Sequence, residues 1–236
     1  MRTVTYASTT DSDWLFQTTT ALSETGGVLA KNLDRRALLQ LGSHLGDIYP
    51  HRDADSTGLT SIRDKETSAA GYLGFSSKAL RLHTDASNED NPPNIMILWC
   101  EQPATKGGDT TLADMRAVYR DLYHKWAALL EEPVIRLLST RPVRTVPIFE
   151  RRGLRLITRF RTDALSEVVS KHKLMFAAIQ RRMKVHTTRI RLAAGSAVVL
   201  NNGQWVHGRT QHVGERQMQR LLLMARLDEL RGFRPD

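Results

Sequence analysis

The chain has 236 residues, one cysteine and a formal net charge of +9 at pH 7. This length suits one domain with a sizeable core, so we expect a single domain over residues 1–236. Cys100 cannot form an intrachain disulfide, no basic segment followed by an apolar core opens the chain, and no run approaches the roughly 20 apolar residues of a membrane span. We therefore expect a cytoplasmic protein without a membrane segment.

Basic residues are concentrated in one part of the chain. Between Arg136 and Arg191 there are 15 Lys or Arg residues against three acidic ones. Such an asymmetry can raise the local concentration of an acidic partner. A solvated, arginine-rich surface explains it equally well. Aromatic–basic interleaving, zinc-finger spacing and a helix-turn-helix signature are all missing from the sequence, so nucleic acid is not an expected partner.

The first half of the chain predicts helices and strands in alternation. Apolar spacing indicates helices at 13–22 and 34–45, the second with Asp34 as its N-cap. A strand begins at 26–29, residues 58–63 alternate in the manner of a strand, and residues 94–100 form a stronger, apolar strand. The run around Cys100 is therefore expected to be buried.

The second half predicts mostly strands. An amphipathic helix at 114–130 should pack on a sheet, and residues 134–157 are strands interrupted by Pro142, Pro147 and Gly153. A second amphipathic helix is expected at 163–183, and strands at 190–200 and 221–226 close the set. The pattern predicts a mainly β fold with flanking helices, a double-stranded β-helix or jelly roll.

Two histidines and one aspartate stand in a pattern that suits a redox metal. His83 and Asp85 flank one residue, and His207 lies far downstream. Two neutral imidazoles and one carboxylate can occupy one face of an octahedral iron(II) ion and leave three positions open. In an extended backbone the first and third residues of His-X-Asp point the same way, so one strand could offer both to one ion.

Groups suited to a dicarboxylate surround this set. Thr110 lies 25 residues after Asp85, and Arg216 and Arg220 lie 9 and 13 residues after His207. A hydroxyl and a guanidinium at such offsets can hold the distal carboxylate of 2-oxoglutarate. Arg220 begins an apolar strand, where an inward-facing arginine is costly unless a carboxylate pairs with it. We therefore expect Arg220 to face inward and Arg216 to be exposed.

At these residues the chain resembles the iron(II)/2-oxoglutarate-dependent dioxygenases related to taurine dioxygenase and clavaminate synthase. The resemblance runs from about Gly26 to Arg226 and is sharpest at Leu82-His83-Thr84-Asp85, Gly107-Gly108-Asp109-Thr110 and His207-Gly208-Arg209. It implies that iron(II) is bound by His83, Asp85 and His207, with dioxygen as cosubstrate. It also implies that 2-oxoglutarate is bound by Thr110 and Arg220. Arg209 is expected to brace the iron ligands or to neutralise a carboxylate near iron. Asn201-Asn202 stands where the family commonly has Asp-Asn, which makes a supporting contact there different from the family's.

Substrate recognition is predicted from a second similarity. The segment Arg159-Phe160-Arg161-Thr162-Asp163 resembles the one that meets the far end of the substrate in amino-acid hydroxylases related to clavaminate synthase. A basic side chain favours a carboxylate, a phosphate or another anion. We therefore expect a small-molecule substrate, anionic or bound to a carrier protein, that contacts Arg161, Arg159 and Arg63. An exposed strand-end arginine is the alternative for Arg161.

The combined prediction is an oxygenase that hydroxylates an unactivated C–H bond of a small amino-acid-like or carrier-tethered substrate in secondary metabolism. Desaturation or cyclisation stays open, since substrate placement decides that branch. Halogenation is disfavoured, because family halogenases have a small residue where Asp85 stands. A non-catalytic jelly-roll protein for an acidic partner is a second alternative. A zinc hydrolase using the same three ligands is a third, but it leaves Thr110 and Arg220 without a role.

Overall fold

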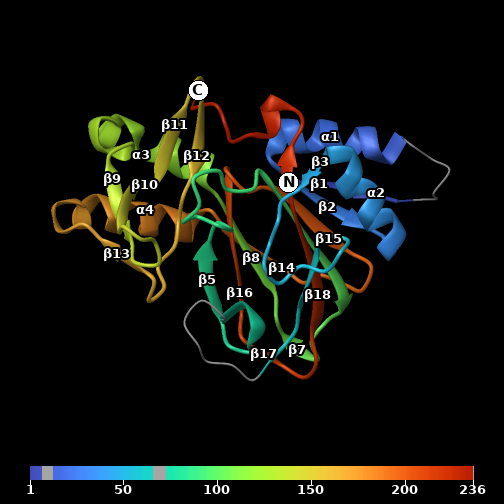
Figure 1. Cartoon of the computed structure of the whole chain (residues 1–236). Helices are drawn as coiled ribbons and strands as arrows, with labels where there is room; N and C mark the ends of the chain where they lie inside the picture. The colour runs from blue at the N-terminus through green and yellow to red at the C-terminus, as the bar shows by residue number, and fades with distance from the viewer. Residues whose placement is uncertain (7–12, 66–72, 236) are drawn as a thin grey trace.

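A computed structural model describes residues 1–6, 13–65 and 73–235. Two β-sheets face each other in it (Figure 1). The larger sheet has the order β1 (Arg2–Thr5), β2 (Gly27–Lys31), β15 (Ala197–Asn201), β6 (Ile95–Gln102), β18 (Gln217–Ala225) and β3 (Gly46–Ile48), with β4 (Leu59–Ile62) also paired to β18. The smaller sheet has the order β14 (Thr187–Ile190), β8 (Thr110–Asp114), β16 (Trp205–Arg209) and β5 (Leu80–His83).

The period of two along each strand decides which side chains face the space between the sheets. Met96, Leu98 and Cys100 of β6 share one buried cluster with Leu112 of β8 and Trp205 of β16. Alternate residues of β6, such as Ile97, belong instead to the cluster under the N-terminal helices. The predicted buried strand around Cys100 is therefore confirmed, and it is buried because both of its faces are covered.

Helices cover the outer face of each sheet (Figure 1). On the larger sheet lie α1 (Asp13–Thr25) and α2 (Arg35–Leu45), whose apolar residues pack against the outer residues of the strands. The predicted N-cap is confirmed, since the Asp34 side chain accepts a hydrogen bond of 2.7 Å from the amide of Ala37. None of the described helices is long and apolar enough to cross a bilayer.

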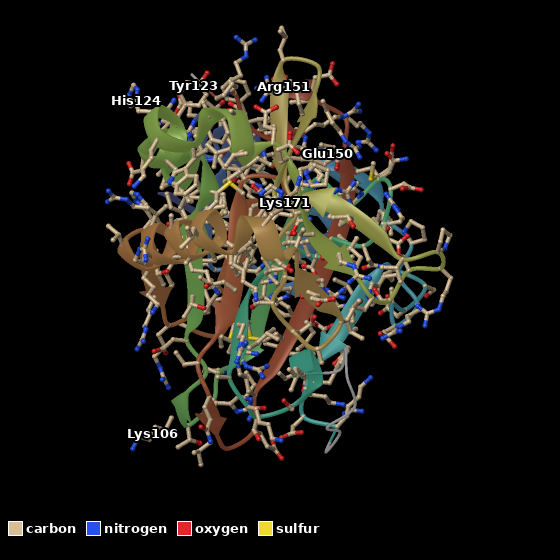
Figure 2. All side chains as sticks on the ribbon, turned by 90° about the vertical axis from the view of Figure 1, so that its left-hand side faces the viewer. Lys106, Tyr123, His124, Glu150, Arg151 and Lys171 are labelled. Atoms are coloured by element: carbon tan, nitrogen blue, oxygen red, sulfur yellow. The ribbon has the colours of Figure 1, made fainter. Side chains whose placement is uncertain are left out.

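The smaller sheet is covered by α3 (Met115–Leu130) and α4 (Lys173–Val185), the side of the molecule that faces the viewer in Figure 2. Near them lie short strands between β8 and β14: β9 (Pro133–Leu137), β10 (Arg144–Pro147), β13 (Ser166–Val168) and the hairpin of β11 (Phe149–Arg152) with β12 (Arg155–Thr158). The set is completed by β7 (Lys106–Gly107), β17 (His212–Val213), η1 (Leu73–Phe75), η2 (Ser170–His172) and η3 (Asp228–Leu230). This arrangement confirms the expected mainly β jelly roll with flanking helices.

Two predicted elements are wrong in part. The helix expected at 163–183 begins only at Lys173, because Ser166–Val168 pairs instead with β9, and this pairing overrides the helical spacing of its apolar residues. The single strand expected at 190–200 is two strands in different sheets, β14 and β15. Gly195, with φ +76°, lies in the turn between them, in a conformation that favours glycine.

Candidate functional site

The two histidines of the candidate metal site lie on neighbouring strands of the smaller sheet. His83 ends β5, and His207 lies in the middle of β16 directly opposite it, with the ring centroids 4.4 Å apart. Gly208 permits this close approach of the strands, because a Cβ there would lie 2.5 Å from the carbonyl oxygen of Leu80. The sheet register therefore joins two segments that are 124 residues apart in the sequence.

Asp85 reaches the same site from a turn rather than from the strand. Strand β5 ends at His83, so the expected extended His-X-Asp geometry is wrong at its third residue. The buried Asn202 holds this turn: its Oδ1 accepts from the amide of Asp85 at 2.9 Å, and its Nδ2 donates to the carbonyls of Asp85 at 3.1 Å and Pro93 at 2.9 Å. Asn202 thus fixes the position of the carboxylate through the backbone.

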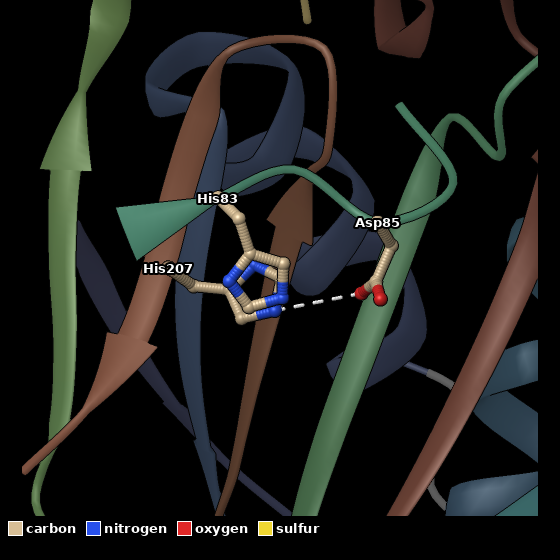
Figure 3. A group of neighbouring side chains, drawn as sticks. All are labelled: His83, Asp85 and His207. Carbon is tan, nitrogen blue, oxygen red and sulfur yellow. Dashed lines mark ion pairs between the residues drawn. The ribbon is translucent and has the colours of Figure 1, made fainter. Parts of the chain in front are cut away.

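The three side chains converge on one point (Figure 3). One ligand atom from each of His83, Asp85 and His207 lies within 4.8 Å of the others, and Nε2 of His207 is 3.5 Å from Oδ2 of Asp85. Nδ1 of His83 lies 2.9 Å from the carbonyl oxygen of Arg81. A proton on Nδ1 donates to that carbonyl, which leaves Nε2 free to bind a metal, an arrangement common among metal-binding histidines.

The buried atoms of this cluster have the protonation states that a metal requires. Burial lowers the pKa of His207 to about 3, so its imidazole is neutral at neutral pH. Burial opposes ionisation of Asp85, but the positive charge of Arg220 outweighs it and brings the pKa to about 2. Among the described residues, Oδ2 of Asp85 has no hydrogen-bond partner although it is buried. The neutral imidazole of His207 and the unsatisfied carboxylate of Asp85, together with Nε2 of His83, fit an iron(II) ion.

Arg220 faces inward from β18, as expected, but it contacts Asp85, one of the candidate metal ligands. Its Nη1 donates to Oδ1 of Asp85 at 2.5 Å, and its Nη2 lies 3.1 Å from Nε2 of His51. The guanidinium is therefore placed between the carboxylate of the metal site and a histidine that the sequence had not connected with it. The predicted role of Arg220 in holding 2-oxoglutarate remains a prediction.

Arg216 is buried, and the expectation that it is exposed is wrong. Only 7% of it is exposed, and within the described residues its guanidinium makes no ion pair or hydrogen bond. Burial lowers its pKa to about 10, which still leaves it charged at neutral pH. It lines a small cavity with Gly107 and Gly108, and a Cβ on Gly108 would lie 3.0 Å from Cδ of Arg216. A buried cation without a counter-ion is costly, so this position suits an anionic ligand.

Thr110 and Arg209 lie opposite each other in the register of β8 and β16. Thr110 is buried on the same strand face as Leu112, which points between the sheets. The terminal nitrogens of Arg209 donate to the carbonyls of Leu73, Gly74, Ser76 and Lys78. These bonds hold the segment that precedes β5, the strand that ends at His83, and the predicted role of Arg209 near iron remains a prediction.

The three arginines proposed for substrate have different surroundings. Arg161 follows Phe160, whose backbone is hydrogen-bonded to Thr84 of the site. Its guanidinium donates to both carboxylate oxygens of Asp163, at 2.9 and 2.5 Å. Arg63 is exposed after the end of β4, and in the described ranges it makes no ion pair. Arg159 is only 2% exposed and donates to Glu150 and to the carbonyls of Ser87, Glu89 and Asp90. Its donors are used within the protein, so the structure contradicts a substrate contact by Arg159.

We expect Arg159 to stabilise the fold. Replacing it with alanine leaves Glu150 without its buried partner and should lower the free energy of unfolding by about 3 kcal/mol. Arg152→Ala is the matched control, because Arg152 donates to the same carboxylate from an exposed position and should cost at most about 1 kcal/mol. Urea denaturation measures the free energy of unfolding of both variants. Equal decreases in the two would show that the burial of Arg159 adds no stability.

Comparisons with known proteins agree with this geometry. No curated protein matches the sequence. Among solved structures, an asparagine oxygenase in complex with iron(II), hydroxyasparagine and succinate has a TM-score of 0.74 at 15% identity, covering 94% of this chain and 93% of the other. A putative α-ketoglutarate-dependent taurine dioxygenase from Burkholderia xenovorans has a TM-score of 0.69 at 17% identity, covering 91% and 84%. At these identities the likeness shows the fold.

The sequence also matches a family model. Residues 3–173 match the model described as taurine catabolism dioxygenase TauD, TfdA family. This range includes His83, Asp85 and Thr110 and ends before His207, which the structure brings to the same point through the pairing of β5 with β16. The chain therefore belongs to the TauD/TfdA family of iron(II)- and 2-oxoglutarate-dependent dioxygenases.

Proposed function

We propose that this dioxygenase hydroxylates an unactivated C–H bond of a small amino-acid-like substrate. The observation that carries the substrate class is a pair of opposite charges, Arg161 and Asp163, beside the metal site. Burial opposes ionisation of Asp163, but hydrogen bonds and charge from Arg161 lower its pKa, with a smaller contribution from His83. A guanidinium and a carboxylate next to each other complement a molecule that carries both an acid and an amine.

We further propose a division of labour between the arginines of the inner face. Arg216, buried and without a counter-ion in the described residues, is placed to receive the distal carboxylate of 2-oxoglutarate, with Thr110 assisting. Arg220 orients Asp85 through the bond of 2.5 Å between them. A planar guanidinium suits both tasks, because it can bind two carboxylate oxygens at once.

His83, Asp85 and His207 would hold the iron, and iron(II) with 2-oxoglutarate and dioxygen supplies the oxidising power for the C–H bond. The protein holds the reacting groups in place and keeps water out of the site. Met96, Leu98 and Trp205 belong to the apolar cluster between the sheets and exclude water from that side of the site. Neutral His207 and ionised Asp85 need no proton transfer before they bind a metal.

The structure favours a free small molecule over an acidic carrier as the substrate form. Many basic side chains of the 136–191 segment already have acidic partners, so its formal charge overstates the attraction to an acidic protein. Eight arginines of this segment form ion pairs: Arg136, Arg144, Arg151, Arg152, Arg159, Arg161, Arg182 and Arg191. Glu150 and Arg151, which each form ion pairs with other residues, lie in the upper part of the view in Figure 2.

The test is a substrate screen scored by succinate release and by the mass of the product. Iron(II) and 2-oxoglutarate are loaded without oxygen, and free amino acids, their derivatives and carrier-tethered amino acids are then offered with oxygen. We expect succinate and a product heavier by one oxygen atom from a free amino acid or a close derivative. Turnover of the carrier-tethered form alone would overturn the preference for a free substrate. A product lighter by two hydrogen atoms would indicate desaturation or cyclisation instead.

Once a substrate is known, Arg161→Ala tests the role of the charge pair. The change leaves Asp163 without its partner. Turnover of substrates with an anionic far end should therefore fall, and turnover of cationic ones should rise, each by roughly fivefold, as expected for about 1 kcal/mol. Asp163→Asn in the same background should remove the gain for cations. An unchanged ratio of kcat/KM values between the two substrate types would place the pair outside the substrate pocket.

A non-catalytic binding protein with this fold is the second candidate. Loss of a ligand or of the buried arginine would have favoured it. All three ligand side chains converge, and Arg216 is buried without a counter-ion in the described part of the chain. The catalytic function is therefore better supported.

A further inference from the structure

A second cavity is lined by Asn202 and by residues 91–94, which follow the turn that carries Asp85. Its volume is about 740 Å³, which is within the range of small-molecule sites. Its walls are the 91–94 loop, the hairpin of β11 and β12, Asn202-Gly203 and the segment around η3 near the C-terminus. In Figure 1 this hairpin and the C-terminus lie together at one end of the molecule. Four arginines and two acids line this arginine cavity: Arg152, Arg155, Arg231, Arg234, Asp228 and Glu229.

Two of the four arginines have donors to spare. Arg155 uses Nη1 for the carbonyls of Glu229 and Gly232, at 3.0 and 3.3 Å, while its Nε and Nη2 make no hydrogen bond within the described ranges. Arg234 makes neither a hydrogen bond nor an ion pair with any described residue. By contrast, Arg231 is bonded to Asp228 and to the carbonyl of Ala225.

The two spare guanidinium groups line the same cavity. Burial and the positive charge of Arg234 lower the pKa of Arg155, and the negative charges of Glu229 and Asp228 offset only part of this shift. An anion bound between them would relieve this repulsion and pair with both. The same wall holds Thr158, whose buried hydroxyl has no hydrogen-bond partner among the described residues. An unsatisfied hydroxyl at such a place can donate to an oxygen of a ligand.

The rest of the wall is apolar. Leu154, at the tip of the hairpin, is 79% exposed, and Ile157, Met224 and Pro92 continue the apolar surface into the cavity. Exposed leucine beside unpaired arginine suits a ligand that has an organic part as well as an anionic group. A phosphate group matches the charged part better than a carboxylate does, because its charge of up to two can neutralise both guanidinium groups.

We propose that the arginine cavity binds a phosphorylated small molecule, with its phosphate group between Arg155 and Arg234. The organic part of the ligand lies along Leu154 and Met224. This site is separate from the metal centre and does not depend on the proposed substrate. It gives the Lys- and Arg-rich segment a specific partner, since Arg155 belongs to that segment.

The amides of Asn201 and Asn202 connect the cavity to the metal site. The side chain of Asn201 binds the backbone of Gly232 on both sides, with its Nδ2 donating to the carbonyl at 2.8 Å and its Oδ1 accepting from the amide at 3.2 Å. Asn202 lines the cavity and holds the backbone of Asp85. A ligand in the cavity therefore lies against Asn202, the residue that holds the turn of Asp85.

The experiment measures anion binding by calorimetry on the full chain, loaded with zinc(II) and saturating 2-oxoglutarate so that anions cannot enter the metal site. The probes are inorganic phosphate, adenosine monophosphate and succinate. We expect adenosine monophosphate to bind more tightly than inorganic phosphate, and succinate more weakly than either. Arg234→Ala and Arg155→Ala should each weaken phosphate binding by about tenfold or more.

Arg181→Ala is the matched control, because it removes the same charge from an exposed position on α4, away from the cavity. It should bind the probes as the unaltered protein does. If Arg155→Ala fails to fold, Arg234→Ala alone tests the phosphate site, since Arg234 has no partner among the described residues and its removal breaks no described contact. Undetectable binding to the unaltered protein, or unchanged binding in Arg234→Ala, would overturn the proposal. Equal affinity for inorganic phosphate and adenosine monophosphate would overturn the part of the proposal that places the organic part of the ligand along Leu154 and Met224.

Discussion

Replacing His207 with alanine is expected to abolish iron(II) binding and turnover while leaving the fold in place. His207 lies opposite His83 in the sheet register, and its neutral imidazole is one of three ligand groups within 4.8 Å. Loss of a group that only supports a ligand typically costs about 10- to 100-fold in metal affinity, and loss of a ligand itself should cost more. Anaerobic calorimetry with iron(II) measures the binding, and succinate release measures turnover. His83→Ala should behave in the same way.

The matched control is His172→Ala, which removes another buried imidazole from a position outside the ligand cluster. It should keep iron(II) binding even if it lowers the melting temperature. This comparison separates loss of a ligand from general destabilisation of a buried site. Full turnover by His207→Ala or His83→Ala would refute the assignment of the metal centre.

Arg216→Ala should weaken binding of 2-oxoglutarate far more than Arg220→Ala does. Breaking a buried, charge-assisted pair on one side costs about 2–5 kcal/mol, or roughly 30-fold to several thousand-fold in affinity. Arg220 donates to Asp85, so its removal should act first on iron(II) affinity. Titration of each zinc(II)-loaded variant with 2-oxoglutarate, together with separate iron(II) titrations, distinguishes the two effects.

Arg191→Ala provides the control for this comparison. Arg191 lines the same small cavity as Arg216, but its side chain is 53% exposed and donates to backbone carbonyls. Its loss should change 2-oxoglutarate affinity only slightly. If Arg220→Ala loses 2-oxoglutarate while Arg216→Ala retains it, the assignment expected from the sequence is restored and Arg216 needs another anion.

The proposed metal ligands could be named from the sequence, but the way in which they meet could not. The offsets of His83, Asp85 and His207 were visible, whereas β16 was not predicted as a strand. Its sequence Trp205–Arg209 contains a glycine and two polar residues, and only the approach of β5 and β8 on both sides makes it a strand. The existence of the site was therefore predictable from the sequence. Its geometry was not, because it depends on the pairing of β16 with β5 and β8, which are distant in the sequence.

The roles of individual arginines were the least predictable part. Sequence alone gives the order of Arg209, Arg216 and Arg220 but not the carbonyls and carboxylates that lie opposite them after folding. Arg209 meets four carbonyls of the 73–78 segment, and Arg216 turns inward beside Gly108. The only signals for Arg216 were its offset of 9 residues from His207 and its spacing of four residues from Arg220, and neither shows which way its side chain points. His51 carried no local signal, because its contact with Arg220 joins positions 169 residues apart.

The neighbouring amides of Asn201 and Asn202 have a consequence for local unfolding. One side chain protects the amide proton of Gly232 and the next protects that of Asp85. Asn201 ends β15 and Asn202 begins the turn that follows it, so opening at one of these neighbours disturbs the backbone of the other. The turn that presents a metal ligand and the segment near residue 232 therefore belong to one cooperative unit. The segment near residue 232 contributes no ligand, yet its opening helps to set how long the turn of Asp85 stays in its folded conformation.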